Sequence, residues 1–325
     1  MKPDNQIAIF SLDSGSDFAS QVAAHLGIPL GKHEERDFED GEHKIRPLET
    51  VRNRDVFVVQ SLNSSDGFNT NDKLVRLLFL LASLRDAGAA RINVVAPYLC
   101  YSRKDRRTKP HDPVTTRYVA QLFEAVTIDT MVTVDVHNRA AFENAFRCPT
   151  VHLSAREAFI DYLLPELGDR EITVASPDIG GVKRAQLFRE SLASRLERPV
   201  GSAFMEKHRS GGEVSGSAVV GDIRNRTVLI LDDLIAGGGT MQRAAEAFKD
   251  QGAEDVMAIA THAVFTHDTG DKLASPALSR VILGNTITPS LPSLKTKVEL
   301  VDITADIADT ITALHEGRDV TDLES

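Results

Sequence analysis

Apolar runs alternate with segments of helical periodicity along most of the chain. The apolar runs are short, rich in β-branched residues and almost free of charge, as is typical of strands buried on both faces of a sheet. They begin at Ile7, Val56, Ile92, Met131, Ile172, Ser217, Thr227, Val256 and Val281. Helical patterns lie between them, for example over residues 72–89 and 240–253. This alternation predicts an α/β protein with mostly parallel sheets flanked by helices.

Two of the predicted helix-to-strand units share a local pattern. In each, a basic residue and an Asp precede Gly-Ala and the next strand, and the glycines are Gly88 and Gly252. Glycine is expected there as a helix C-cap, so the repeat predicts two α/β domains of the same kind. A length of 325 residues suits two domains. We expect an N-terminal domain over 1–152 and a C-terminal domain over 153–301, and the sequence leaves open whether a last helix within 302–325 packs back on the first.

Composition disfavours several classes of protein, namely nucleic-acid-binding, disulfide-rich and membrane-spanning proteins. The chain has 47 acidic and 37 basic residues, a formal net charge of −10, which disfavours binding to nucleic acid or to an anionic membrane. Only two cysteines are present and the N-terminus lacks a signal-peptide pattern, so we expect a cytoplasmic protein without disulfides. The longest apolar stretch is interrupted by Arg76 and Ser83 and is too short to span a bilayer.

The segment LILDDLIAGGGT, residues 229–240, has the strongest chemical signal. An apolar strand is predicted to end in Asp232 and Asp233, and a glycine-rich turn then leads to Thr240 at the start of a helix. Backbone N–H groups from Gly237 to Thr240 can surround a phosphate, and the two carboxylates can accept hydrogen bonds from ribose hydroxyls. A simple helix cap is the alternative, but three glycines followed by Thr favour a sugar-phosphate site.

This segment resembles the phosphoribosyl-diphosphate loop of type I phosphoribosyltransferases and ribose-phosphate diphosphokinases. The resemblance implies two domains of the type I phosphoribosyltransferase kind. It also implies a set of ribose 5-phosphate-binding residues, namely Asp232, Asp233, Ala236, Gly237, Gly238, Gly239 and Thr240. The family usually has Asp and Thr where this chain has Ala236 and Gly237, and the missing acid favours the diphosphokinases over the transferases.

Further segments occur in the order of the diphosphokinases, so that the resemblance covers nearly the whole chain. Residues 96–108 resemble their Pro-Tyr-x-x-Tyr-x-Arg-x-Asp segment, which implies that Arg103, Lys104 and Asp105 contact ATP. Lys104 stands where the family usually has Gln. Taken alone, this segment is equally compatible with a solvated basic loop.

Two strand-end segments resemble the family's sites for Mg²⁺ and nucleotide. Thr133–Asn138 is similar to Asp-Leu-His-Ala, which implies that His137 helps to hold Mg²⁺-ATP, although a lone His is more often structural. Ala175–Ala185 is similar to Ser-Pro-Asp-x-Gly-Gly-x-Lys-Arg, which implies that Asp178 is a Mg²⁺ ligand. Mg²⁺ is therefore the cofactor that the resemblance implies.

Two polar segments complete the resemblance. Residues 205–216 look like the flexible catalytic loop, with Lys207 and Arg209 as catalytic cations, whereas a charge-rich hairpin is the alternative. The stretch around Phe38 resembles the adenine-binding hairpin, which implies that Phe38 stacks on the base and that Asp40 and Glu42 lie near its edge. In the family this hairpin reaches the ATP site of a neighbouring subunit, which implies a homo-oligomer, either a dimer or a hexamer of dimers.

Together these resemblances imply a Mg²⁺-dependent transferase of nucleotide biosynthesis. It would move the β,γ-diphosphate of ATP to the anomeric hydroxyl of ribose 5-phosphate, giving 5-phosphoribosyl 1-diphosphate and AMP. A phosphoribosyltransferase with the same sugar loop is one alternative, but it would not need the segments of Arg103 and His137. A catalytically silent regulatory homologue is the other, and it should have lost the loop cations or the Mg²⁺ ligands.

Overall fold

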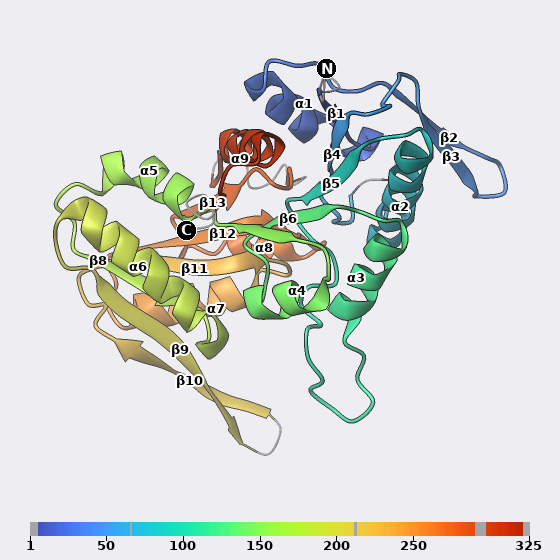
Figure 1. Ribbon diagram of the computed structural model, residues 1–325. Coiled ribbons are helices and arrows are strands. Elements are labelled where there is room, and N and C mark those ends of the chain that lie inside the picture. The colour runs from blue at the N-terminus through green and yellow to red at the C-terminus, as the bar shows by residue number, and fades with distance from the viewer. Residues whose placement is uncertain (1–5, 66, 211–212, 290–296, 321–325) are drawn as a thin grey trace. The chain divides into compact units, whose positions relative to one another are not determined.

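The computed structural model describes residues 6–65, 67–210, 213–289 and 297–320, without the side chains of 207–217. The chain divides into two compact units, one formed by Met1–Ser154 with Ile303–Ser325 and the other by Ala155–Asp302. Each contains a mostly parallel sheet with flanking helices, which confirms the predicted α/β class (Figure 1). Within the described residues, no helix combines the length and apolar character needed to cross a membrane.

The first unit is built on a parallel sheet in the order β1-β4-β5-β6-β7. Its strands are β1 (Ile7–Phe10), β4 (Asp55–Val59), β5 (Arg91–Ala96), β6 (Thr130–Val134) and β7 (Thr150–Leu153). Its helices are α1 (Ser16–His25), α2 (Thr70–Asp86), α3 (Thr115–Ala125), α4 (Arg139–Ala145) and α9 (Thr304–Glu316). Every residue of β4 is buried, as the unbroken apolar run of a strand covered on both faces predicts.

The second unit contains a larger sheet in the order β10-β9-β8-β11-β12-β13-β14. Neighbouring strands are parallel except for β10, which is antiparallel to β9. The strands are β8 (Ile172–Ser176), β9 (Gly201–Ser210), β10 (Glu213–Gly221), β11 (Thr227–Ile235), β12 (Asp255–Ala263), β13 (Arg280–Gly284) and β14 (Val298–Val301). The helices are α5 (Arg156–Leu167), α6 (Val182–Leu196), α7 (Gly239–Asp250) and α8 (Thr269–Leu273).

The repeated Gly-Ala pattern forms the same C-cap in both units. Gly88 follows α2 with φ +91°, and the N–H of Ala89 donates to the carbonyl of Leu84 at 3.2 Å. Gly252 follows α7 with the same φ, and the next N–H again reaches back to the last turn of the helix. Because side chains strain this left-handed conformation, glycine is required at both positions. The predicted caps are confirmed.

A small hairpin stands apart from the sheet of the first unit. It consists of β2 (His33–Asp37) and β3 (His43–Pro47), which are antiparallel to each other and extend away from the sheet (Figure 1). The apolar-run criterion missed these strands because most of their side chains are polar, Ile45 being the buried apolar residue. Tertiary contacts rather than an apolar pattern therefore fix this hairpin.

The C-terminal helix α9 is anchored on the first unit by a buried carboxylate. Asp55, at the start of β4, is fully buried and accepts hydrogen bonds from Arg91 Nε at 3.1 Å and Asn93 Nδ2 at 2.8 Å. His315, in the last turn of α9, places Nδ1 at 2.8 Å from Asp55 Oδ2. Since a buried carboxylate is costly unless it is paired, these contacts stabilise the docking of α9.

Candidate active-site residues in each unit

The two candidate sugar-binding carboxylates lie within β11 and not at its end. The strand was predicted to stop at Asp233, but it continues to Ile235 because β12 stays paired with it as far as Ile235. Pairing with β8 on the other side stops at Ile230. Asp232 and Asp233 therefore lie where β11 has lost one of its two neighbouring strands, so that side-chain groups from α6 can reach them.

One arginine bridges both carboxylates. Arg184, on α6, places Nη1 at 3.2 Å from Asp232 Oδ1 and at 3.2 Å from Asp233 Oδ1. Burial, and then the adjacent Asp233, raise the pKa of Asp232, whereas the guanidinium of Arg184 acts in the opposite direction. The arrangement is an acid pair held by a cation, with Asp233 buried and Asp232 partly exposed, and it is suited to binding a group with several hydroxyls. Arg184 belongs to the motif of residues 175–185, but the sequence alone predicted no role for it.

The turn between β11 and α7 has the geometry of an anion site. Gly238 has φ +72°, and Thr269 Oγ1 holds the turn by donating to the carbonyl of Ala236 at 2.5 Å. The helix α7 begins at Gly239, so the amide groups of Gly239 and Thr240 have no partner within the helix. Such amides and the helix dipole favour a bound phosphate.

A lysine far along the chain lies beside this turn. A Cβ added at Gly238 would lie 3.3 Å from Lys272 Cβ, and one added at Gly237 would lie 3.9 Å from Lys272 Nζ. Lys272 is on α8, a short helix with no recognisable sequence pattern. Its ammonium group adds a positive charge to the turn that sequence reasoning missed, because only the fold brings α8 to this place.

Asp178 is fixed by the turn that follows β8. Its Oδ1 accepts hydrogen bonds from the N–H groups of Gly180 at 2.9 Å and Gly181 at 3.3 Å. A Cβ at Gly181 would lie 2.6 Å from Ser176 Oγ, so glycine is required for this close approach. A carboxylate has about four lone-pair positions, so these bonds orient Asp178 without using its full capacity to bind a hard cation.

The basic loop of the first unit is organised by its own ion pair. Lys104 Nζ lies 2.7 Å from Asp112 Oδ2, and Lys104 holds the pKa of Asp112 well below its usual range. Arg103 is exposed. Asp105 Oδ2 accepts a hydrogen bond from Asn138 Nδ2 at 2.6 Å, which ties the loop to the exposed segment of His137 after β6. The structure thus brings together the residues near Asp105 and His137.

The predicted adenine-binding residues gather at the tip of the β2–β3 hairpin. Phe38 is 41% exposed, and the guanidinium of Arg36 lies 5.3 Å from the centre of its ring. The N–H of Phe38 donates to the carbonyl of Glu42 at 2.9 Å, and the N–H of Glu42 donates to Asp40 Oδ1 at 3.1 Å. This tip presents an aromatic face and two acidic groups to the surroundings.

The segment predicted as a flexible loop is mostly a hairpin. Lys207 and Arg209 lie on β9, which runs to Ser210 and is paired with β10 from Glu213 onward. The alternative of a charge-rich hairpin therefore describes the backbone better. The side chains of Lys207 and Arg209 lie outside the described part of the chain, so their catalytic role stays a prediction.

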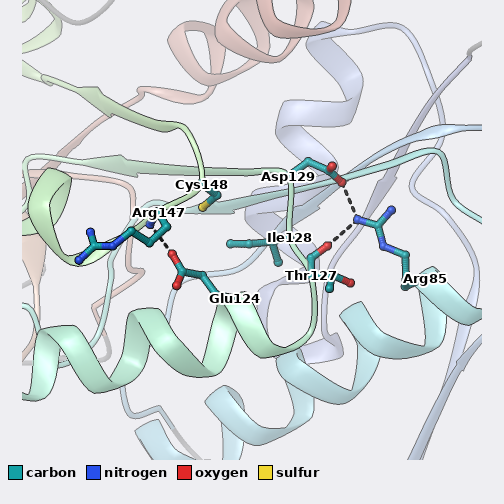
Figure 2. A pocket seen from close by; sticks show the side chains of 7 residues that line it. All are labelled: Arg85, Glu124, Thr127, Ile128, Asp129, Arg147 and Cys148. Atoms are coloured by element: carbon teal, nitrogen blue, oxygen red, sulfur yellow. Dashed lines mark hydrogen bonds and ion pairs between the residues drawn. The ribbon is translucent and has the colours of Figure 1, made fainter.

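A surface hollow of about 640 Å³ in the first unit contains none of the predicted site residues (Figure 2). Arg85 Nη2 lies 2.5 Å from Asp129 Oδ2, so these two charges compensate each other, and Glu124 accepts a hydrogen bond from the backbone N–H of Arg147. Burial raises the pKa of the Cys148 thiol in its lining to about 11, so the thiol stays protonated and unreactive near neutral pH. The hollow offers no reactive group.

Comparison with known proteins gives matches over both units. A family model described as the N-terminal domain of ribose phosphate pyrophosphokinase matches residues 7–126, and a phosphoribosyl synthetase-associated domain matches residues 199–324. The chain is 34% identical over 320 residues to a ribose-phosphate pyrophosphokinase of Clostridium perfringens, covering 98% of this chain and 97% of that protein. A second one, from Caldanaerobacter subterraneus, is 35% identical and is covered to 98%.

A solved structure is also similar over nearly its whole length. The phosphoribosylpyrophosphate synthetase from Mycobacterium smegmatis superimposes with a TM-score of 0.88 at 30% sequence identity. The match covers 96% of this chain and 99% of that one, so the similarity includes both units.

Proposed function

The chain belongs to the ribose-phosphate pyrophosphokinase family, and we propose that it transfers the β,γ-diphosphate of ATP to the anomeric hydroxyl of ribose 5-phosphate, releasing AMP. The observation that carries this function is the full-length match, which covers 98% of the chain and therefore includes both units. A phosphoribosyltransferase would need the sugar loop but not the segments of Arg103 and His137. We also propose that the protein is cytoplasmic, because its two cysteines are free and thiols stay reduced in the cytoplasm.

Ribose 5-phosphate is assigned to the second unit. Its phosphate would lie against the amide groups of Gly238, Gly239 and Thr240, with Lys272 adding a positive charge. Its ring hydroxyls would donate to Asp232 and Asp233, the pair that Arg184 holds. Ala236 and Gly237 line the same turn but carry neither an acid nor a hydroxyl, which is the departure from the family pattern.

ATP is assigned mainly to the first unit. Arg103, Lys104, Asp105 and His137 would contact the nucleotide, since Asp105 and the His137 segment are joined through Asn138. Phe38 is exposed at the hairpin tip, where it would stack on the adenine of ATP bound to a neighbouring subunit, with Asp40 and Glu42 at the edge of the base. The active protein would therefore be a homo-oligomer, either a dimer or a hexamer of dimers.

Mg²⁺ is the metal ion that this reaction would use. The oriented carboxylate of Asp178 is a hard oxygen donor of the kind that Mg²⁺ prefers, and His137 would fit through a water that the ion keeps. When bound with ATP, Mg²⁺ would neutralise negative charge on the polyphosphate. Asp178 and His137 would then act by holding and orienting the nucleotide.

The remaining work of the protein is alignment and charge neutralisation. The anomeric oxygen must lie in line with the β-phosphorus, and the carboxylate pair would fix the sugar for that approach. Lys207 and Arg209 would supply positive charge to the transferring diphosphate. Ala236 leaves the sugar loop without an acid, so no residue of this loop is assigned as a general base.

A coupled assay tests the proposed function. The purified chain is incubated with ATP, ribose 5-phosphate and Mg²⁺, and the formation of AMP and phosphoribosyl diphosphate is measured by chromatography. We expect AMP only when all three are supplied. Absence of AMP would support the silent homologue, and phosphoribosyl transfer to a nucleobase without ATP would support the transferase.

Replacing Lys272 by Ala is expected to raise the KM for ribose 5-phosphate about tenfold. One charge-assisted contact contributes about 1.5–3 kcal/mol, and partial exposure of Lys272 lowers that value. The KM for ATP should change little. Steady-state kinetics with each substrate varied in turn measures both constants, and Lys249→Ala, at the other end of α7, is the matched control. A larger change for ATP than for the sugar would contradict the assignment of Lys272.

A further inference from the structure

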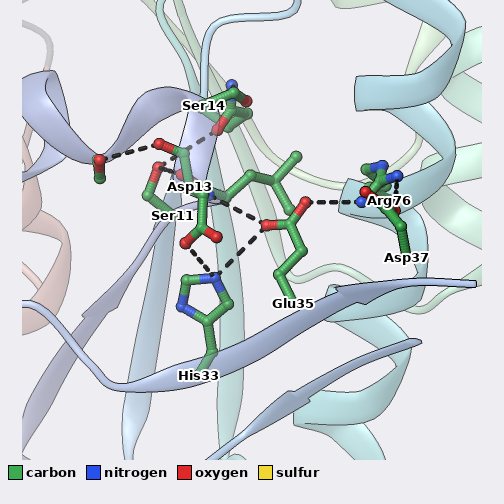
Figure 3. A network of polar contacts seen from close by, with 10 residues as sticks. Ser11, Asp13, Ser14, His33, Glu35, Asp37 and Arg76 are labelled. Carbon is green, nitrogen blue, oxygen red and sulfur yellow. Dashed lines mark hydrogen bonds and ion pairs between the residues drawn. The ribbon is translucent and has the colours of Figure 1, made fainter. Parts of the chain in front are cut away.

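Three potential metal ligands meet at the base of the β2–β3 hairpin (Figure 3). Asp13 follows β1, whereas His33 and Glu35 are alternate residues of β2 and share one face of that strand. His33 Nε2 lies 3.3 Å from Asp13 Oδ1 and 3.6 Å from Glu35 Oε2. One donor atom from each residue lies within 4.8 Å of the other two. None of these residues belongs to the sites assigned above.

The imidazole of His33 provides an independent sign of a ligand. Its side chain is only 8% exposed, and the buried Nε2 makes no hydrogen bond of normal geometry to a described group, because its contacts with Asp13 and Glu35 at 3.3 Å and 3.6 Å are ion pairs only. Figure 3 shows this nitrogen directed toward the carboxylates of Asp13 and Glu35. Since buried polar atoms in proteins nearly always have a hydrogen-bond partner, a group that satisfies Nε2 in solution is expected at this point.

The surrounding contacts hold the donors in place. Glu35 is 6% exposed, and its Oε2 accepts a hydrogen bond from the N–H of Asp13 at 3.1 Å. Arg76 Nη1, from α2, lies 3.0 Å from Glu35 Oε1, and the same guanidinium pairs with Asp37. Hydrogen bonds of this kind to a carboxylate orient it for a metal ion.

The charge at this place also favours a cation. Asp13, Glu35 and Asp37 contribute three negative charges and Arg76 contributes one positive charge, which leaves −2 around His33. Glu35, and then Asp13, raise the pKa of His33, and a metal ion would take the place of the proton that these carboxylates favour. A divalent ion would balance this charge. The mixed set of one nitrogen and two oxygens indicates a metal of borderline softness, because Mg²⁺ and Ca²⁺ prefer oxygen alone.

We propose that Asp13, His33 and Glu35 bind one Zn²⁺ ion, distinct from the Mg²⁺ used in the reaction. In a tetrahedral site with bonds of about 2.0–2.1 Å, the donor atoms are separated by about 3.4 Å. The observed separations of 3.3 Å and 3.6 Å from His33 Nε2 are close to this value. The ion would join the segment after β1 to β2 and so fix the base of the hairpin that carries Phe38.

Metal content measures this site without relying on activity. The full chain is stripped with a chelator, dialysed against Zn²⁺ at neutral pH without nucleotide, and analysed for zinc per chain. We expect wild type to hold one ion more than Asp13→Asn, His33→Ala and Glu35→Gln, and the affinity of Asp13→Asn to fall more than about tenfold. His25→Ala is the matched control, because His25 is an exposed histidine on α1 and should keep the wild-type content.

Folding of the variants is checked by circular dichroism. Asp13 is 72% exposed, so Asp13→Asn should fold normally even if a change at His33 or Glu35 does not. A wild-type chain that binds no Zn²⁺, or an equal zinc content in wild type and Asp13→Asn, would overturn the proposal. Either result would leave a protonated His33 paired with the two carboxylates as the role of the cluster.

Discussion

Replacing Lys207 by Ala is expected to lower kcat by about 10³-fold while leaving the equilibrium affinity for ATP nearly unchanged. A positive charge that acts on the transferring diphosphate has its largest effect in the transition state, and loss of one such group typically costs about 10²–10³ in rate. The reduction should therefore appear in kcat and in kcat/KM to a similar extent. Steady-state kinetics gives the rate, and calorimetry with ATP and Mg²⁺ gives the affinity.

A neighbouring substitution separates charge from strand geometry. Glu206→Ala changes the adjacent, partly exposed position of β9 without removing a cation and should keep kcat within about threefold of wild type. Lys207→Arg keeps the positive charge but replaces the compact ammonium group by a larger, planar guanidinium, so partial activity is expected. Loss of ATP affinity in Lys207→Ala with turnover preserved at saturating ATP would rule out the catalytic role.

Replacing Asp233 by Ala is expected to raise the KM for ribose 5-phosphate about 10- to 100-fold. The buried carboxylate of Asp233 is assigned to a sugar hydroxyl, and a hydrogen bond to a charged group contributes about 1.5–3 kcal/mol. Arg184 also lies 3.2 Å from Asp232, so its guanidinium would still have a partner in this variant. Kinetics with ribose 5-phosphate and ATP varied separately should show little change in the KM for ATP.

An exposed aspartate of the same unit is the control for Asp233. The side chain of Asp222 is 75% exposed and lies 3.5 Å from Arg226, a weak surface pair, so Asp222→Ala should leave both constants unchanged. A raised KM for ATP together with a normal constant for the sugar would mean that the two substrates have been assigned to the wrong units.

Features that follow from local periodicity could be predicted from the sequence. Neighbouring residues in the sequence determine the strand of Asp232, the glycine turn and the helix after it. The same holds for the caps at Gly88 and Gly252. Apolar runs mark buried strands, and a positive φ demands glycine, so each feature has a local physical cause. The end of β11 was misplaced because a neighbouring strand, distant in sequence, decides where pairing stops.

Contacts between distant segments could not be predicted in this way. Arg184 and Lys272 are ordinary charged residues in sequence, and only the packing of α6 and α8 brings them to the sugar turn. The buried face of the hairpin of β2 and β3 is formed largely by polar side chains such as His33 and Glu35, so it lacks the apolar pattern that marks a strand in the sequence. The cluster of Asp13 and His33 likewise depends on a contact between β2 and the segment that follows β1.

The docking of α9 has a consequence for the order in which the chain folds during synthesis. The first unit contains the beginning and the end of the sequence, and the buried Asp55 needs His315 as one of its partners. Residues up to 154 are synthesised long before α9, so the first unit lacks that helix until the last part of the chain has been translated. Domains commonly fold as units as they emerge from the ribosome. The unit whose translation begins first is therefore unable to complete its fold until α9 has left the ribosome.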